Sequence, residues 1–244
     1  MSEQPTTEQG RHIAAPWQDP SFVAAWTAGD TMNELLAFPR RLAAAIVAAD
    51  RPEVRLVIDI ASGPGAFLAC LLDEFPAARG IWSDASAAML GRARETLAPY
   101  SERVEFRPAD MTALNPTRHS PSTDTSLTAA GMPAGADVIV TSRAAHHLDR
   151  VGLPAFYAEA AALLAPGGWL INLDHTGPDE TWNKRFRTVR ARFAPPRPET
   201  KHHHNYPLPS IEDHLNAYAD AGLTDVEIAW KAFYTCLFMG KKPA

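Results

Sequence analysis

The chain has 244 residues, of which 46% are hydrophobic and 21% are charged, an ordinary composition for a folded domain. That length suffices for one α/β domain with a full core and is short for two independent domains. The net charge of -5 and the pI near 6.0 exclude a general electrostatic attraction for nucleic acid or for an anionic membrane.

The cysteines and the apolar runs of the sequence indicate in which cellular compartment the protein is expected. Only Cys70 and Cys236 occur, each within an apolar run, so we expect buried reduced thiols rather than a disulfide or a metal site. The sequence has no signal-peptide pattern, no run of about 18 apolar residues and no lipidation motif. These features predict a cytoplasmic protein.

About 50 residues precede the first predicted strand. Residues 1–10 are polar, residues 20–29 carry aromatic side chains, and Thr31-Met32-Asn33-Glu34 is a capping-box pattern that starts a helix. We expect Pro39 to kink this helix. Its apolar residues are Leu35, Leu36, Leu42, Ile46 and Val47.

The stretch from Val54 to Leu68 changes from a strand to a helix through a glycine turn. Its first half is short, β-branched and almost uncharged, which is typical of a strand buried on both faces of a parallel sheet. Gly63 and Gly65 allow a tight turn and the close approach of a ligand, and the following helix directs unpaired N–H groups towards that turn. The pattern predicts a nucleotide-like ligand.

The pair Gly63-x-Gly65 is also two-thirds of the dinucleotide fingerprint, so other residues must decide which nucleotide is favoured. Leu68 replaces the third fingerprint glycine, which counts against a pyrophosphate-bearing cofactor such as NAD. Asp59 lies at the strand end, where a carboxylate can meet an ammonium group but would repel a phosphate. The pattern Asp59-x-x-x-Gly63-x-Gly65 resembles motif I of class I S-adenosylmethionine-dependent methyltransferases.

This resemblance implies S-adenosyl-L-methionine as cofactor, with contacts at the ends of the next two strands. Asp84 follows a strand at 80–83 and lies 21 residues after Gly63, where an acid accepts hydrogen bonds from ribose hydroxyls. Asp110-Met111 follows a strand at 104–107 and matches the family position that contacts the adenine amine and ring; a turn-forming Asp is the alternative. The predicted cofactor-binding residues are Asp59, Ser62, Gly63, Gly65, Asp84, Ala85, Asp110, Met111 and Ser142.

The middle of the chain indicates the acceptor class. Residues 115–136 are rich in Ser, Thr, Pro, Ala and Gly, and we expect a flexible surface insertion there. After a strand at 137–142, the peptide Ala145-His146-His147-Leu148 resembles the corresponding segment of small-molecule methyltransferases. Methyltransferases that act on nucleobase amines or on glutamine carry Asn/Asp-Pro-Pro-Tyr here, and this chain does not. A small-molecule acceptor is therefore favoured.

The last part of the chain completes the predicted fold. A helix at 154–164 leads into Leu-x-Pro-Gly-Gly and a strand at 169–174, another family feature, so that the resemblance covers residues 53–175. We expect residues 176–209 to cover the substrate and residues 226–239 to form an antiparallel hairpin. The prediction is a Rossmann-like α/β fold whose seven-stranded, mostly parallel sheet has the order 3-2-1-4-5-7-6 with helices on both faces. The resemblance implies that residues 1–50 form a helical lid and residues 51–244 the methyltransferase domain. Five aromatic or methionine residues of the lid could line a substrate mouth, with ordinary packing of the lid on the core as the alternative: Trp17, Phe22, Trp26, Met32 and Phe38.

Methyl transfer from a sulfonium mainly requires that the acceptor be held close and aligned, and a base is needed only if the acceptor must lose a proton. His146, His147 and His175, which follow the fourth and fifth strands, are the candidate bases, and Asp174 could orient one of them. Their alternative role is packing under the lid, with ring nitrogens bonded to the backbone. We predict no metal site, because the consecutive histidines at 202–204 cannot all face one ion.

Two other functions remain open alongside a methyltransferase. A non-catalytic module of this fold could bind the cofactor or a partner without turnover, and an NAD-dependent oxidoreductase shares the glycine turn and the ribose-binding acid. The acceptor atom can be oxygen, nitrogen, sulfur or carbon, because the motifs do not select among them. The oligomeric state is equally open, with a homodimer as one option.

Overall fold

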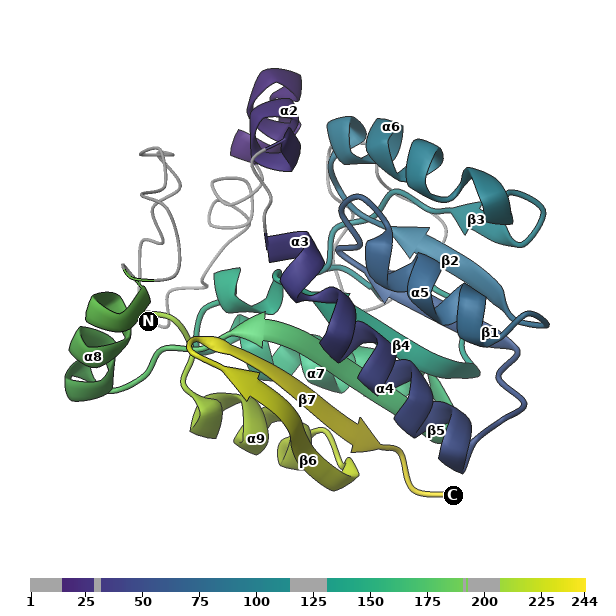
Figure 1. Ribbon diagram of the computed structural model, residues 1–244. Helices are drawn as coiled ribbons and strands as arrows, with labels where there is room; N and C mark the ends of the chain where they lie inside the picture. Colours follow the sequence, from purple (N-terminus) through teal and green to yellow (C-terminus); the bar gives the residue numbers. More distant parts are fainter. Residues whose placement is uncertain (1–14, 29–31, 115–130, 191, 193–206) are drawn as a thin grey trace, which may run out of the picture.

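The computed structural model describes residues 15–28, 32–114, 131–190, 192 and 207–244 (Figure 1). Seven strands form one sheet in the order β3-β2-β1-β4-β5-β7-β6, as predicted. Every neighbouring pair among the first five strands is parallel, and β7 runs antiparallel to both β5 and β6. The strands are β1 (Leu56–Ile60), β2 (Arg79–Ser83), β3 (Val104–Phe106), β4 (Ala136–Ser142), β5 (Leu164–His175), β6 (Thr224–Ala232) and β7 (Thr235–Lys241).

The central strands are buried on both faces because helices cover each side of the sheet. On one face, α4 (Ala37–Asp50), α5 (Ala66–Glu74) and α6 (Ala87–Thr96) share a core with residues of β1, β4 and β5. On the other face, α7 (Gly152–Leu163) and α9 (Ile211–Asp220) pack against the alternate side chains of the same strands (Figure 1). This two-sided burial explains the continuous apolar runs of β1 and β4.

Close packing between α5 and β2 depends on a glycine that the sequence pattern did not single out. Leu68 of α5 is fully buried, and a Cβ built on Gly80 of β2 would lie 2.8 Å from the Leu68 Cδ1 atom. In a dinucleotide fold, a glycine on the helix provides this space. Here the helix carries the leucine and the strand carries the glycine.

The N-terminal helices divide near the predicted kink. Helix α3 (Met32–Leu35) ends one residue before Leu36, and α4 begins at Ala37, so that Pro39 occupies the first turn of α4. Proline is tolerated there because first-turn N–H groups have no helical partner. Helix α4 belongs to the sheet-covering layer, whereas η1 (Ala15–Gln18) and α2 (Pro20–Ala28) lie nearer to α6. Thr31 of the predicted capping box is outside the described residues.

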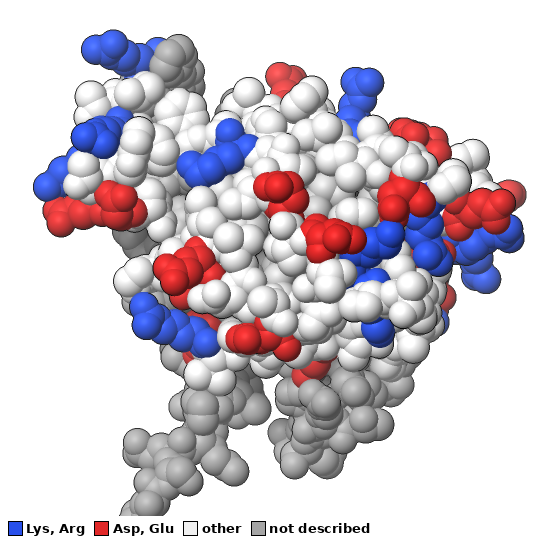
Figure 2. All heavy atoms as spheres, turned by 90° about the horizontal axis from the view of Figure 1, so that it is seen from below, with Lys and Arg blue, Asp and Glu red and all other residues white. Residues whose placement is uncertain are grey.

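Two predicted segments are only partly described. For the insertion at 115–136, the structure describes residues 131–136, and for the covering segment at 176–209 it describes α8 (Glu180–Arg190) and residues near it. The histidines at 202–204 lie outside the described residues. On the face drawn in Figure 2, Lys and Arg side chains are interspersed with Asp and Glu and do not gather into one basic patch. No described helix has the length and apolar character needed to cross a membrane.

Candidate active site

The glycine turn between β1 and α5 is held in a left-handed conformation. Ala61, Gly63 and Gly65 have φ angles of 52°, 53° and 85°. A Cβ on Gly63 would meet only the Met89 Sδ atom at 3.9 Å, so Gly63 is required by its backbone angle more than by crowding. Ala61 lies directly after β1, and its positive φ angle is strained for a residue other than glycine. Backbone strain of this kind clusters at functional sites.

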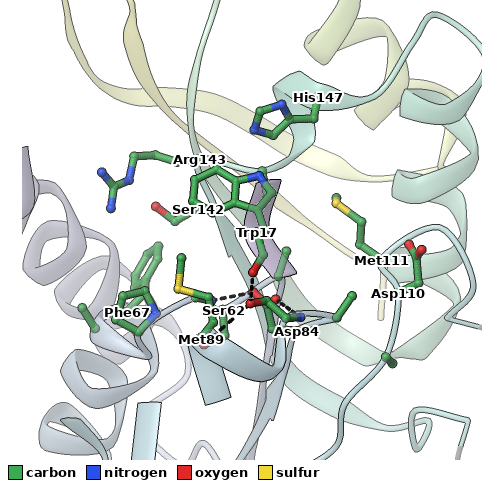
Figure 3. A pocket seen from close by; sticks show the side chains of 18 of the residues that line it. Trp17, Ser62, Phe67, Asp84, Met89, Asp110, Met111, Ser142, Arg143 and His147 are labelled. Carbon is green, nitrogen blue, oxygen red and sulfur yellow. Dashed lines mark hydrogen bonds between the residues drawn. The ribbon is translucent and has the colours of Figure 1, made fainter. Parts of the chain in front are cut away.

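A cavity of about 320 Å³ opens beside this turn, at the C-terminal ends of β1, β2 and β4 (Figure 3). Open α/β sheets bind ligands at this edge, where the strand order reverses between β1 and β4. In Figure 3, Asp110 and Met111 lie on one side of Trp17, and Phe67 and Arg143 lie on the other. The sequence-predicted residues that line the cavity are Ser62, Gly63, Asp84, Ala85, Asp110, Met111, Ser142 and His147.

Asp84 connects the end of β2 to the glycine turn. Its Oδ2 atom accepts the Gly63 N–H at 2.8 Å, and its Oδ1 atom accepts the Ser86 N–H at 2.8 Å. Each carboxylate oxygen has a second lone pair, so both can still accept a ligand hydroxyl. Burial raises the pKa of Asp84, against the lowering effect of these N–H donors.

Asp110 both stabilises its own turn and lines the cavity. Its Oδ1 atom accepts from the backbone N–H and the hydroxyl of Thr112, each at 2.8 Å. Asp110 therefore forms the turn, as the alternative interpretation predicts. It can also contact a ligand, because Asp110 and Met111 line the cavity. One side chain serves both purposes.

Asp59, predicted from the sequence to meet the cofactor directly or through water, is not among the residues that line the cavity. Its side chain is 1% exposed and lies beneath the turn, outside the cavity lining. The Oδ2 atom accepts from the Ser62 hydroxyl at 2.6 Å and from the Leu68 N–H at 3.1 Å, while Oδ1 is buried with no hydrogen-bond partner. Burial raises the pKa of Asp59 to about 7, opposed by these two donors and by the charge of Arg40.

Gly65 also lies behind the cavity. A Cβ at this position would come within 2.8 Å of the Leu97 Cδ1 atom. The absent side chain therefore makes room for Leu97, which is 1% exposed in the core, rather than for a ligand. The glycine remains necessary, for its backbone angle and for packing.

The three candidate histidines occupy different positions. His147 lines the cavity, whereas His146 and His175 do not. His146 is 4% exposed, and its Nδ1 atom lies 2.5 Å from the Asp174 Oδ1 atom, so Asp174 does orient one of the candidates. The Nδ1 atom of His175 lies 3.0 Å from the Thr235 hydroxyl.

Ring contacts join these histidines into one cluster. The centroids of His146 and His147 are 4.1 Å apart, and those of His146 and His175 are 5.4 Å apart. Asp174 is fully buried and also accepts the backbone N–H groups of His146 and His175, at 2.9 and 2.8 Å. The cluster therefore combines a cavity-facing imidazole with a buried imidazole on a fixed carboxylate.

Several cavity residues could not be found by sequence motifs. Trp17 and Gln18 come from η1, which is attached to the end of β2 by bonds from Ser86 Oγ to the Trp17 carbonyl and from Gln18 Nε2 to the Ala85 carbonyl. Arg40 comes from α4 and is 6% exposed. Trp17 and Trp26 are two of the aromatic residues expected at a substrate mouth, and both line the cavity. Gln18 and Arg40 reach it through tertiary packing and belong to no local pattern that marks a site.

Arg143 is the other cavity residue that motif reasoning missed. It follows β4 with a φ of 54°, and its guanidinium carbon lies 4.7 Å from the Trp26 ring centroid of α2. The feature that marks Arg143 as a site residue is its positive φ angle directly after a central strand. That angle is seen only in the structure and not in the sequence. Within the described residues, no group of three or more His, Cys, Asp or Glu side chains could hold a metal ion.

Comparisons with known proteins find similarity to methyltransferases. Residues 57–168 match the family model described as "Methyltransferase domain". Those residues contain the glycine turn, Asp84, Asp110 and the histidine pair. Over these residues, the chain is similar to a methyltransferase domain. The histidine cluster extends from the matched residues to Asp174 and His175, just beyond them.

Individual proteins similar to this chain are longer than it. Over 118 residues, the chain is 29% identical to 3-amino-4-hydroxybenzoate 4-O-methyltransferase from Streptomyces cremeus, covering 48% of this chain and 28% of that protein. An O-methyltransferase family protein from Burkholderia thailandensis superposes with a TM-score of 0.69 at 22% identity, covering 100% of this chain and 65% of that one. Human N-acetylserotonin methyltransferase in complex with SAM superposes with a TM-score of 0.61 at 14% identity, covering 99% of this chain and 61% of that one. The chain thus spans less than two-thirds of each of these proteins.

Proposed function

We propose that this protein transfers the methyl group of S-adenosylmethionine to a hydroxyl oxygen of a small molecule. The observation that carries the proposal is the convergence of the Gly63 turn, Asp84 and Asp110 on one cavity. Two carboxylates suit an adenosine, because ribose hydroxyls and the adenine amine are hydrogen-bond donors. The similarity to methyltransferases, among them a 4-O-methyltransferase and an O-methyltransferase family protein, supports the same cofactor and acceptor atom.

The residues of the cavity fit this cofactor part by part. Asp110 and Met111 would hold the adenine, Asp84 the ribose, and the Gly63 turn with Ser62, Ala85 and Ser142 the remainder. Arg40, on the α4 side of the cavity, would provide positive charge for a carboxylate. When bound, the cofactor supplies a sulfonium-activated methyl group. The protein's contribution is to hold the acceptor in line and to exclude water.

The histidine cluster supports a hydroxyl as acceptor, because a hydroxyl must lose its proton. His147 lines the cavity and would contact the acceptor, and its ring packs on His146, which Asp174 holds. The Asp174 carboxylate fixes the orientation of the His146 ring, on which the cavity-lining His147 packs. We infer that the pair serves as the general base, and that His175, bonded to Thr235, has a structural role.

The test is transfer of a labelled methyl group from S-adenosylmethionine to a panel of phenolic acceptors, including hydroxybenzoates. We expect His146→Asn and His147→Asn each to lower kcat by about 100-fold or more with an unchanged affinity for S-adenosylhomocysteine. His175→Asn is the matched control and should stay within about tenfold of wild type. Loss of activity in the control alone would contradict the assignment of the base.

The same experiment separates the two alternatives. A non-catalytic module would bind S-adenosylhomocysteine and give no labelled product with any acceptor. An NAD-dependent oxidoreductase would bind NAD, and the replacement of the third fingerprint glycine by Leu68 and the match to a methyltransferase domain argue against it.

The remaining proposals concern location and partners. We propose a cytoplasmic protein, supported by the two free thiols of Cys70 and Cys236, whose partner is a small-molecule acceptor rather than nucleic acid or a membrane. The mixed charges of Figure 2 agree with that partner. Residues 1–50 as a lid and residues 51–244 as the methyltransferase domain also remain a proposal, with the division falling at the end of α4.

A further inference from the structure

The glycine turn is held by side chains from the neighbouring strand β2. The Gly63 N–H donates to Asp84 Oδ2, and the Gly63 carbonyl accepts the indole N–H of Trp82 at 2.9 Å. In addition, the Ser62 N–H donates to the Ser83 carbonyl at 2.9 Å. Both polar groups of Gly63 are thus engaged by one short segment of chain.

We propose that Trp82 is a positioning residue for the cofactor, acting through the Gly63 carbonyl. The proposal rests on the proposed function and names a residue that never touches the ligand. Trp82 is fully buried and lies outside the cavity lining, whereas Gly63 and Asp84 line the cavity. Asp84 holds the peptide group before the Gly63 Cα atom and Trp82 holds the peptide group after it, so the indole restrains the turn on which the carboxylate that would bind the ribose is anchored.

The indole provides something that a purely apolar side chain would not. Trp82 pairs with Asp59 of β1 and with Phe106 of β3, and its ring lies 5.7 Å from the Phe106 ring. An aliphatic residue could fill a buried strand position of this kind, but a buried tryptophan also needs an acceptor for its N–H. The Gly63 carbonyl is that acceptor, and it belongs to a turn that lines the cavity.

The arrangement predicts an effect on cofactor affinity rather than on chemistry. Without the indole N–H, the Gly63–Pro64 peptide group can rotate, and cofactor binding must then restrict that rotation again. A neutral hydrogen bond contributes about 0.5–1.5 kcal/mol, which corresponds to about 2- to 13-fold in affinity. The catalytic step should be affected little once the cofactor is bound.

The experiment compares Trp82→Phe with Phe106→Leu in the full chain. Phe106 packs on Trp82 but makes no hydrogen bond to the turn, so Phe106→Leu is the control for lost core packing. We expect Trp82→Phe to raise the Kd for S-adenosylhomocysteine and the KM for S-adenosylmethionine about fivefold or more, with kcat within about threefold. Phe106→Leu should leave both values within about twofold. Unchanged binding in Trp82→Phe, or equal weakening in both variants, would overturn the proposal.

A second measurement does not depend on how well the variants fold. In wild-type protein, the Trp82 indole N–H should exchange slowly with D2O in nuclear magnetic resonance spectra, and its resonance should shift when S-adenosylhomocysteine binds. Fast exchange without ligand, or a resonance that binding leaves unmoved, would contradict the positioning role. If wild-type protein binds no S-adenosylhomocysteine, the proposed function fails, and slow exchange would then show that the bond exists without serving a cofactor.

Discussion

Buried carboxylates at the two ends of the parallel strands differ in their ion pairs and hydrogen bonds. At the N-terminal edge, Asp137 of β4 is paired with the Arg51 guanidinium and accepts the N–H groups of Arg55 and Leu56 at 2.7 and 3.0 Å. At the C-terminal edge, Asp59 accepts from a hydroxyl and one N–H and forms no ion pair with any described residue. One carboxylate is neutralised by its surroundings, and the other is not.

The difference separates stability from function. A paired, hydrogen-bonded carboxylate such as Asp137 fixes the start of β1 against β4 and leaves nothing for a ligand to satisfy. Asp59 and Asp84 are buried with weaker compensation, and burial raises the pKa of both. Of these two, Asp84 lines the cavity, where a hydrogen-donating ligand would supply what the protein lacks, as is typical of binding sites.

The largest effect we predict is a pH dependence of stability that arises from Asp59. Its pKa of about 7 in the folded protein exceeds the ordinary value of 3.8, a difference worth at most about 4 kcal/mol. Because the folded pKa is raised, this contribution is fully present below about pH 4 and is lost as the pH rises through about 7. The free energy of unfolding of wild-type protein, minus that of Asp59→Asn, should fall over this interval without ligand.

The variant also defines the control for that experiment. Asp59→Asn keeps the size of the side chain and removes the titration, so other groups cancel in the difference. A difference that stays constant between pH 4.5 and 8 would show that Asp59 is ionised throughout, and the contrast between the two edges would then be lost.

Removing the charge at the other edge should destabilise the protein at every pH. Asp137→Asn breaks the pair with Arg51 and weakens the bonds to Arg55 and Leu56, which should cost about 3 kcal/mol. Unfolding by urea would measure it. The affinity for S-adenosylhomocysteine should be unchanged at a temperature where the variant is folded, because this cluster lies at the opposite edge of the sheet. Weakened binding at full folding would break the comparison.

The smallest effect on stability that we predict concerns Asp213, whose pKa is lowered rather than raised. Asp213 and Ser210 form a capping box at the start of α9, and hydrogen bonds from the Ser210 backbone and side chain lower the pKa of Asp213. A lowered pKa gives stability that is present above about pH 4 and is lost as the pH falls further. Ser210→Ala should cost about 1 kcal/mol at pH 7 with ligand affinity unchanged. A larger loss, measured by thermal unfolding, would mean that α9 is more strongly coupled to the core.

The sheet was predictable because its determinants are local. The apolar runs of β1 and β4, the glycine turn and the Ser86 and Ser210 helix caps are each visible in a few consecutive residues, and the structure contains all of them. The strand order followed from the family resemblance. Strand β5 is longer than predicted, since it begins at Leu164 and includes the proline-glycine segment.

The site was predictable only where one residue carries the signal. Asp84 and Asp110 follow strands at the expected spacing and line the cavity, whereas Asp59 and Gly65 lie behind it. Sequence spacing places a residue in the turn but cannot tell which side of the backbone faces the cavity. Arg40, Arg143 and Gln18 approach from helices or strained loops, so their positions depend on packing between segments distant in the chain.

The central claim is that the cavity binds S-adenosylmethionine through Asp84 and Asp110. The most direct test is calorimetric titration of wild-type protein with S-adenosylhomocysteine and, separately, with NAD, repeated on Asp84→Asn and Asp110→Asn. Asp73→Asn, which alters an exposed carboxylate bonded to Tyr100, is the matched control. We predict binding of S-adenosylhomocysteine with a Kd of about 1–100 μM, weakened at least tenfold by either site variant and unchanged by the control. Binding of NAD alone, or of neither ligand, would contradict the account.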